Sequence, residues 1–388
     1  MLKRILILLT IIFSFFTLPH AFSAPTPTVD PTPTIVPTPP SIDAKGYVLM
    51  DADTGTILAQ NNESGRMQPA SLTKLMTMYV ASEALKRGQI KLTDTVPVSE
   101  AAWRTGGSRM FIKVGTEVTV QDLLDGIIIA SGNDSCVALA EYIGGNEQTF
   151  TNFMNQTAKQ LGMLNTHFTD STGLPNPDHY TTPYDMALLA RAVINDFPQF
   201  YPLYKQKWIS YNNIKQPNRN RLLWRDPTVD GLKTGHTEEA GFCLVSSALR
   251  NGMRLIAVVM GAPSDQARAS DSQALLNFGY RFFETHKLYD ANQALTHPRV
   301  WLGKSNTVPV GLAAPLSVTI PRNTYAQLKP QLKLPSSLKA PIQQGQVLGT
   351  LEVTLNNKVV SSTPIIALTT DNKANIFSRM IDHVRMWL

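Results

Sequence analysis

The chain has 388 residues, of which 43% are hydrophobic, and a formal net charge of +6. This modest basic excess favours anionic surfaces such as membranes or wall polymers, and we expect no nucleic-acid partner because no basic run is interleaved with aromatic residues. The 7 histidines show no H-x-x-H or H-E-x-x-H spacing, which argues against a zinc peptidase, and we expect neither metal nor cofactor. Cys136 and Cys243 stand in apolar runs and are predicted to be buried free thiols rather than a disulfide framework.

The N-terminus is typical of a secretory signal. Lys3 and Arg4 precede an apolar run over residues 5–18, and small residues follow it. The run is shorter than the ~20 residues that a membrane-spanning helix needs. We expect cleavage after Ser23, so that residues 1–23 are a signal peptide and the mature charge is near +4; an uncleaved anchor is the alternative.

Residues 24–41 are rich in proline and threonine, reading PTPTVDPTPTIVPTPPS from Pro25. Repeated proline fixes φ and removes donors, so we expect an extended tether, with PxxP recognition as a weaker alternative. The remaining stretch of roughly 345 residues is long enough for one large and one small domain.

Ser71 and Lys74 open a segment with helical spacing of apolar residues and share one helix face. A serine hydroxyl is a poor nucleophile without an adjacent base, and a neutral lysine amine can serve as that base. Neutrality requires the lysine pKa to fall from ~10.4 toward ~7–8, which burial and a second cation could cause.

The S-x-x-K spacing alone is weak evidence, because Ser336 and Lys339 repeat it in a proline-rich stretch. S-x-N likewise occurs at Ser131–Asn133 and again at Ser210–Asn212. The ordered set Ser71/Lys74, Ser131/Asn133 and Lys233-Thr234-Gly235 is much more specific. The second motif falls in a loop between two buried helices. The third precedes strands at 241–249 and 254–261, joined by the hairpin signal Asn251-Gly252.

The three motifs together are the signature of penicillin-binding proteins and serine β-lactamases. The surrounding residues resemble low-molecular-weight penicillin-binding proteins, the serine-type D-alanyl-D-alanine carboxypeptidases, from about Lys45 to Leu388. The segments that carry the resemblance are 69–77, 130–134, 218–220 with 222–224, and 230–237.

The resemblance implies a two-step acyl transfer on peptidoglycan stem peptides, with β-lactams as covalent inhibitors. Ser71 would attack the carbonyl between the two D-alanines and Lys74 would take its proton. Ser131 would relay a proton to the departing D-alanine with help from Lys233, while Asn133 holds Lys74 and the substrate backbone.

The family pattern also implies an oxyanion hole formed by the backbone N–H groups of Ser71 and His236, and an arginine facing the terminal carboxylate. Arg219 is that arginine here, although the loop to the K-T-G motif is about one residue shorter than expected. Arg221 stands where a glycine is expected and could disturb or share the role. Both arginines could instead be solvated loop charges. The residues expected to bind substrate are Asn133, Lys233, Thr234, Gly235, His236 and Arg219.

Residues 148–237 contain no glutamate, whereas class A β-lactamases use one there to activate the deacylating water. The acids in this stretch include Asp170, Asp178 and Asp185. The absence of a glutamate favours a peptidase that penicillin traps, with β-lactamase or DD-endopeptidase activity as alternatives. A catalytically weak wall-binding or scaffolding protein is a further alternative.

The expected fold is an α/β domain over residues 42–290, with an antiparallel sheet of about five strands, an all-α lobe and helices near 267–287. Strand-like pieces at 300–302, 316–320 and 351–355, with turns at Gly345 and Gly349, predict a small β-sandwich over 291–370. Residues 340–350 resemble the second domain of DD-carboxypeptidases. This resemblance implies a carboxypeptidase, because the endopeptidase group generally lacks that domain.

Residues 371–388 predict a C-terminal amphipathic helix whose apolar face would lie in a membrane interface. We expect segment 373–388 to attach the protein peripherally to the outer face of the cytoplasmic membrane, in the periplasm. Docking of this helix on the protein's own β-domain is the alternative. The apolar residues of the face are Ile376, Phe377, Met380, Ile381, Val384, Trp387 and Leu388.

Overall fold

The computed structural model describes residues 35–386. The expected signal peptide and the first part of the proline-rich tether lie outside the described residues, as do Trp387 and Leu388. A five-stranded antiparallel sheet in the order β2-β1-β9-β8-β7 confirms the predicted sheet. The strands are β1 (Gly46–Asp51), β2 (Ile57–Asn61), β7 (Val229–Thr237), β8 (Gly241–Arg250) and β9 (Met253–Ala262).

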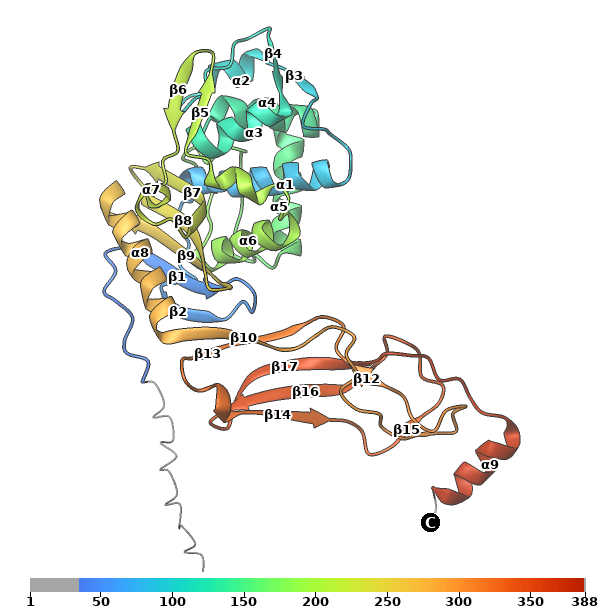
Figure 1. Ribbon diagram of the computed structural model, residues 1–388. Coiled ribbons are helices and arrows are strands. Elements are labelled where there is room, and N and C mark those ends of the chain that lie inside the picture. Colours follow the sequence, from blue (N-terminus) through green and yellow to red (C-terminus); the bar gives the residue numbers. More distant parts are fainter. Residues whose placement is uncertain (1–34, 387–388) are drawn as a thin grey trace, which may run out of the picture. The chain divides into compact units, whose positions relative to one another are not determined.

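Both faces of this sheet are buried, and successive side chains of its central strands enter different cores. In β9, Leu255, Ala257 and Val259 pack in one core, and the residues between them pack in the other. Helix α8 (Asp265–Phe282) covers the first face and α6 (Pro183–Asp196) the second (Figure 1). The helix predicted near 267–287 therefore ends earlier, because the chain from Phe283 onward forms a strand.

The helical lobe holds the segments that carry Ser71 and Ser131. Side-chain caps from Thr119, Asn146 and Thr182 begin three of its helices. The lobe predicted to be all-α also carries two short antiparallel strand pairs, β3–β4, whose strands flank α2 in sequence, and the hairpin β5–β6. Its elements are η1 (Ala70–Thr73), α1 (Lys74–Lys86), β3 (Thr95–Pro97), α2 (Glu100–Arg104), β4 (Glu117–Thr119), α3 (Val120–Asp125), η2 (Gly126–Ala130), α4 (Asn133–Gly144), α5 (Glu147–Gln160), η3 (Tyr201–Lys205), β5 (Trp208–Tyr211) and β6 (Ile214–Pro217). The short helix α7 (Leu222–Arg225) instead packs in the sheet core on the side of α8.

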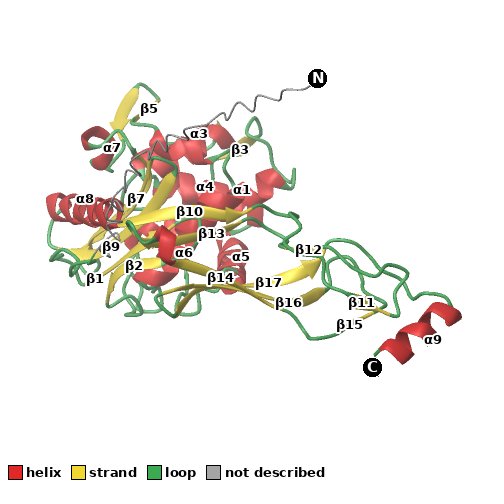
Figure 2. Ribbon diagram, turned by 60° about the horizontal axis from the view of Figure 1, so that its bottom comes forward, coloured by secondary structure: helices red, strands yellow, loops and turns green. Residues whose placement is uncertain are grey.

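The C-terminal part is rich in β-structure and has a core of its own. A four-stranded sheet in the order β12-β17-β16-β14 lies beside the pairs β10–β13 and β11–β15 (Figure 2). Gly349, predicted in a turn, lies inside β16 at a register shift against β17, whereas Gly345 does lie in a turn. Its elements are β10 (Phe283–Tyr289), β11 (Val300–Trp301), β12 (Val310–Gly311), β13 (Leu316–Pro321), η4 (Tyr325–Gln327), β14 (Leu328–Lys333), β15 (Leu338–Lys339), β16 (Val347–Leu355) and β17 (Lys358–Ala367).

Helix α9 (Ile376–Arg385) confirms the predicted C-terminal helix. The Asn375 side chain caps its first turn, and the Leu302 N–H donates to the Asp382 carboxylate at 2.8 Å. Its polar side therefore faces the β-structure, while the apolar side chains of residues 376–384 are exposed. No helix within residues 35–386 is long and apolar enough to cross a membrane.

Candidate active site

Lys74 lies at the start of α1 and is completely buried. Its Nζ donates to Ser71 Oγ at 3.0 Å, to Asn133 Oδ1 at 2.7 Å and to the Thr172 carbonyl oxygen at 2.7 Å. The short helical turn η1 places Ser71 three residues ahead of Lys74, so both side chains lie on one face. The base expected for Ser71 is thus within hydrogen-bonding distance of its hydroxyl.

Ser131 and Asn133 lie between η2 and α4, where the chain turns sharply. Ser131 takes the left-handed conformation with φ of 59°, and its side chain is 2% exposed. Asn133 Nδ2 donates to the Gly106 carbonyl oxygen at 2.7 Å, which leaves Oδ1 toward Lys74. The next residue, Asp134, accepts three backbone N–H groups from residues 110–112 and fixes the neighbouring loop. These bonds hold the S-x-N motif rigid.

Lys233 reaches the same site from strand β7. Its buried Nζ donates to Ser131 Oγ at 3.0 Å and to the Thr234 carbonyl oxygen at 3.0 Å. Gly235 allows β7 to approach the Ser71 turn, because a Cβ there would lie 2.8 Å from the Pro69 carbonyl oxygen. The structure therefore brings the three sequence motifs together from three separate elements.

Burial lowers the pKa of both lysines. For Lys74 this effect is opposed by Asp170 and Asp134 and reinforced by Arg219. The pKa of Lys233 lies well below its ordinary value, first because of burial and then because Lys74 and Arg219 are close. Neither ammonium has a carboxylate hydrogen-bond partner among the described residues. Both shifts make the neutral amine more accessible than it is in a free lysine, which is the direction that general-base chemistry requires.

The arginines near the K-T-G strand behave differently from each other. Arg219 is exposed at the chain surface yet close enough to Lys233 to lower its pKa. Arg221 forms an ion pair with Asp265 and is thereby engaged away from the three motifs. The His236 side chain is exposed, and its ring lies 4.0 Å from that of Phe242.

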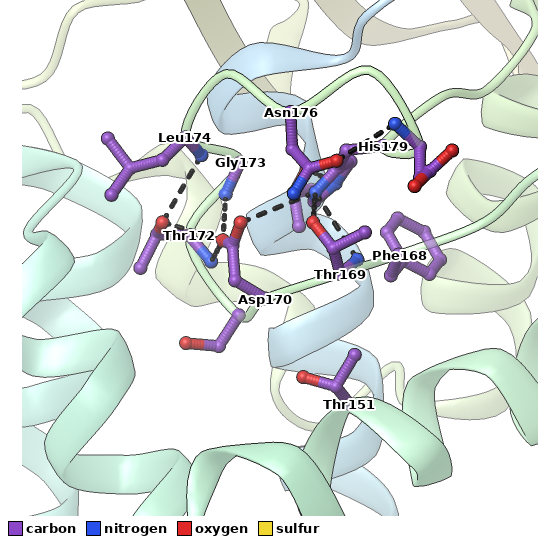
Figure 3. Close-up of polar contacts among 12 residues, drawn as sticks. Thr151, Phe168, Thr169, Asp170, Thr172, Gly173, Leu174, Asn176 and His179 are labelled. Atoms are coloured by element: carbon purple, nitrogen blue, oxygen red, sulfur yellow. Dashed lines mark hydrogen bonds and ion pairs between the residues drawn. The ribbon is translucent and has the colours of Figure 1, made fainter.

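Sequence reasoning missed several residues that shape the site. Thr172 contributes a backbone carbonyl, which has no side-chain signature. Asp170 and His179 organise the turn that presents this carbonyl, as Figure 3 shows. Arg268 of α8, 6% exposed, donates to the carbonyl oxygens of Gly235 at 2.9 Å and Cys243 at 3.2 Å, which ties α8 to the K-T-G strand.

The second copies of the motifs lie elsewhere. Lys339 is in β15 of the C-terminal part, and Asn212 is at the tip of the β5–β6 hairpin, where it donates to the Phe111 carbonyl oxygen. Both cysteines are buried free thiols, as predicted, and burial raises the pKa of Cys136 to about 12. Within residues 35–386, no group of three or more His, Cys, Asp or Glu is placed to hold a metal ion.

Comparison with known proteins agrees with this geometry. Residues 33–264 match the family model for D-alanyl-D-alanine carboxypeptidase, peptidase S11, and residues 283–373 match that for the C-terminal domain of penicillin-binding protein 5. The chain therefore belongs to the D-alanyl-D-alanine carboxypeptidase family, and its class is that of the penicillin-binding serine carboxypeptidases of peptidoglycan.

Individual relatives cover nearly all of the chain. It is 44% identical over 382 residues to the D-alanyl-D-alanine carboxypeptidase DacC of Escherichia coli K12, covering 96% of this chain and 93% of that protein. Penicillin-binding protein 5 from Haemophilus influenzae superposes with a TM-score of 0.84 at 42% identity, covering 87% of this chain and 100% of that one. Penicillin-binding protein D2 from Listeria monocytogenes in its ampicillin-bound form covers 63% of this chain and 100% of its own, with 27% identity and a TM-score of 0.58.

Proposed function

We propose that the mature protein removes the terminal D-alanine of peptidoglycan pentapeptides through an acyl-enzyme on Ser71. The observation that carries this proposal is the hydrogen bond between Lys74 Nζ and Ser71 Oγ in a buried site that lowers the lysine pKa. Neutral Lys74 takes the hydroxyl proton as Ser71 attacks the carbonyl between the two D-alanines. The C–N bond then breaks, and water hydrolyses the resulting ester.

The departing D-alanine needs a proton on its nitrogen. Ser131 Oγ, hydrogen-bonded to Lys233 Nζ, can relay that proton and regain one from the lysine. Developing negative charge on the carbonyl oxygen is met by the backbone N–H groups of Ser71 and His236. Loss of one such donor typically costs about 10²–10³ in rate. Thr234, Lys233 and Arg219 receive the terminal carboxylate, and Asn133 and Gly235 line the same groove.

β-lactams acylate the same serine. If the resulting ester persists, the enzyme is inhibited, and if water hydrolyses it quickly, the β-lactam is destroyed. The three aspartates that could replace the missing glutamate support inhibition. Asp170 accepts hydrogen bonds within its own turn, and Asp185 of α6 accepts from the backbone N–H of Asn165 and the Thr166 hydroxyl. Asp178 is exposed, and among the described residues none of the three contacts Ser71 or Lys74. Penicillin-binding protein D2 from Listeria monocytogenes, in its ampicillin-bound form, supports β-lactam binding at this site.

One experiment tests this reading. The mature protein and its Ser71→Ala variant are incubated with labelled penicillin and with a peptide ending in D-Ala–D-Ala. We expect a covalent adduct and release of D-alanine from the parent only. A parent that neither acylates nor releases D-alanine would favour the scaffolding alternative, and equal activity in the variant would remove Ser71 from its role.

We further propose that α9 attaches the protein to the outer face of the cytoplasmic membrane, in the periplasm. Its exposed apolar residues include Phe377 at 76% and Met380 at 63% exposure, which opposes docking of this face on the β-structure. Asp382 instead holds the polar side to Leu302. A helix with this pattern suits an interface and is too short to span.

Deletion of residues 373–388 should abolish binding to vesicles that contain anionic lipid and leave peptidase activity unchanged. Phe377→Glu should weaken vesicle binding strongly, because it places a charge in the apolar face. Ser378→Glu is the matched control, since it adds the same charge to the next residue, which is polar. Unchanged vesicle binding of the deletion variant would contradict the proposal.

A further inference from the structure

A turn from residues 170–173 packs directly on the segment that carries Ser71 and Lys74. The Thr77 hydroxyl of α1 donates to the Ser171 carbonyl oxygen at 2.6 Å. A side chain on Gly173 would overlap the Ala70 carbonyl oxygen, so the two backbones are in close contact. If the turn moves, the Thr172 carbonyl oxygen, which accepts a hydrogen bond from the proposed base Lys74, moves with it.

The partners of Lys74 define the direction of its lone pair. A neutral amine has two N–H donors and one lone pair. Asn133 Oδ1 and the Thr172 carbonyl oxygen can only accept hydrogen bonds, and each lies 2.7 Å from Nζ. When both N–H groups serve these two acceptors, the lone pair is left for the Ser71 hydroxyl, whose oxygen lies 3.0 Å away.

Asp170 builds the turn that presents the Thr172 carbonyl. Its Oδ1 accepts from the Thr172 N–H at 2.6 Å, the Thr172 hydroxyl at 2.7 Å and the Gly173 N–H at 2.7 Å. Its Oδ2 lies 3.4 Å from His179 Nδ1 (Figure 3). Burial acts to raise the pKa of Asp170, but the hydrogen bonds from His179, Thr172 and Gly173 outweigh it and keep the carboxylate ionised.

His179 joins this turn to the nucleophile segment from the other side. Its ring is 1% exposed, and Nε2 lies 2.9 Å from Thr73 Oγ1, one residue before Lys74. Asp170 and His179 thus connect Thr172, whose carbonyl oxygen contacts the Lys74 amine, with Thr73, which precedes Lys74 in the sequence. This chain of contacts touches neither the Ser71 hydroxyl nor the groove that would take the substrate carboxylate.

We propose that Asp170, supported by His179, is a positioning residue that holds the Thr172 carbonyl on Lys74 and so aims the amine at Ser71. The inference rests on the proposed function, because it assigns Lys74 as the base. Asp170 acts through the backbone of its own turn, and it contacts no reacting atom.

The test compares Asp170→Ala and Asp170→Asn with the parent, using labelled-penicillin stoichiometry to count intact sites. Asp170→Ala should lower kcat per intact site by about 10²-fold with little change in KM, since the base is misplaced rather than the substrate. Asp170→Asn retains an oxygen acceptor for the turn, so its kcat should lie between those of the parent and Asp170→Ala. Asp178→Ala, an exposed acid of the same loop, is the matched control and should match the parent.

The pH profile separates positioning from loss of fold. The Asp170 carboxylate raises the pKa of Lys74, so its removal lowers that pKa. The acid limb of kcat/KM should therefore move to lower pH in both Asp170 variants, even though Asp170→Ala is slower on the plateau. The ionisable groups that act on Lys74 and stay in place in these variants are Asp134, Cys136, Arg219 and Lys233.

Each outcome decides the inference. A parental kcat per intact site in Asp170→Ala would overturn it, including the case in which only the number of intact sites falls. An acid limb that does not move would overturn it as well. A parent that releases no D-alanine and binds no penicillin would instead overturn the proposed function.

Discussion

Two regions of the peptidase part bury cations, and they do so with opposite kinds of partner. In the active site, Lys74 and Lys233 bond only to neutral oxygens among the described residues. Three residues before Lys233 in the same strand, Asp230 accepts two hydrogen bonds from Arg254, at 2.7 and 2.8 Å. The two lysines of the first region have no carboxylate partner among the described residues, whereas Arg254 of the second region forms an ion pair with Asp230.

The difference appears in the direction of the pKa shifts. Burial lowers the pKa of Lys74 and Lys233, and no carboxylate bonded to either amine reverses the effect. Burial also acts to lower the pKa of Arg254, but the hydrogen bonds to Asp230 raise it. The two lysines proposed to transfer protons thus stand among neutral acceptors, while the arginine of the second region stands beside an acid.

The largest expected effect comes from replacing Lys74 with arginine. An arginine side chain keeps the positive charge at every accessible pH and cannot act as a base. Lys74→Arg should therefore lower the rate of acylation by labelled penicillin by about 10²–10⁴-fold, as Lys74→Ala should. If Lys74→Arg keeps the acylation rate within tenfold of the parent, then the positive charge at residue 74 is needed and proton transfer from Ser71 to this residue is not.

Breaking the ion pair of the second region should affect stability instead. Asp230→Ala leaves a largely buried guanidinium without its partner and should lower the free energy of unfolding by about 3 kcal/mol, measured by urea denaturation. Acylation per folded molecule should stay at the parental rate. The double variant Asp230→Ala/Arg254→Met should recover part of the loss. A loss below about 1 kcal/mol in the single variant would remove the contrast between the regions.

The smallest expected effect is a gain in stability when Lys233 is replaced. Lys233→Met removes a buried amine whose charged form is disfavoured and which has no carboxylate partner among the described residues. It should raise the free energy of unfolding at pH 7 by about 1 kcal/mol while abolishing activity. The pKa of Lys233 is lower in the folded than in the unfolded chain, so unfolding takes up a proton at this residue. The contribution of Lys233 to the free energy of unfolding therefore rises with pH, up to the usual lysine pKa.

The gain from Lys233→Met should therefore shrink between pH 7 and pH 10. Urea denaturation of parent and variant at both pH values measures it. A gain that grows with pH would contradict the assigned direction of the shift, and a loss of stability at pH 7 would show that packing around Lys233 outweighs the cost of its charge.

The sequence pointed to the motif side chains of the candidate site more readily than to the groups that support them. Ser71, Ser131 and Lys233 could be singled out because the expected chemistry needs those residue types at fixed spacings, and the structure brings them together. The Thr172 carbonyl could not, since every residue has one and only the folded turn directs it at Lys74. Arg268 was missed for a related reason, because a helical arginine gives no sign that it will donate to backbone oxygens of a neighbouring strand.

Features of the fold that depend on local sequence were predicted, whereas those that depend on contacts between distant segments were not. Alternation and the Asn251-Gly252 signal were enough for the five-stranded sheet and its hairpin. The end of α8 was wrong by several residues, because pairing of β10 with β13 decides where the helix stops. Gly349 was assigned to a turn because glycine is common there, whereas the close approach of the Lys333 backbone explains its place in a strand.

The glycine at position 173 also limits how this protein can change over time. Its φ is +86°, and any added side chain would meet the Ala70 carbonyl oxygen, so both conformation and space exclude substitution. Every exchange at residue 173 should therefore disturb the turn that presents the Thr172 carbonyl oxygen to Lys74. In a saturation mutagenesis scan of penicillin binding, residue 173 should accept no other amino acid without loss of binding.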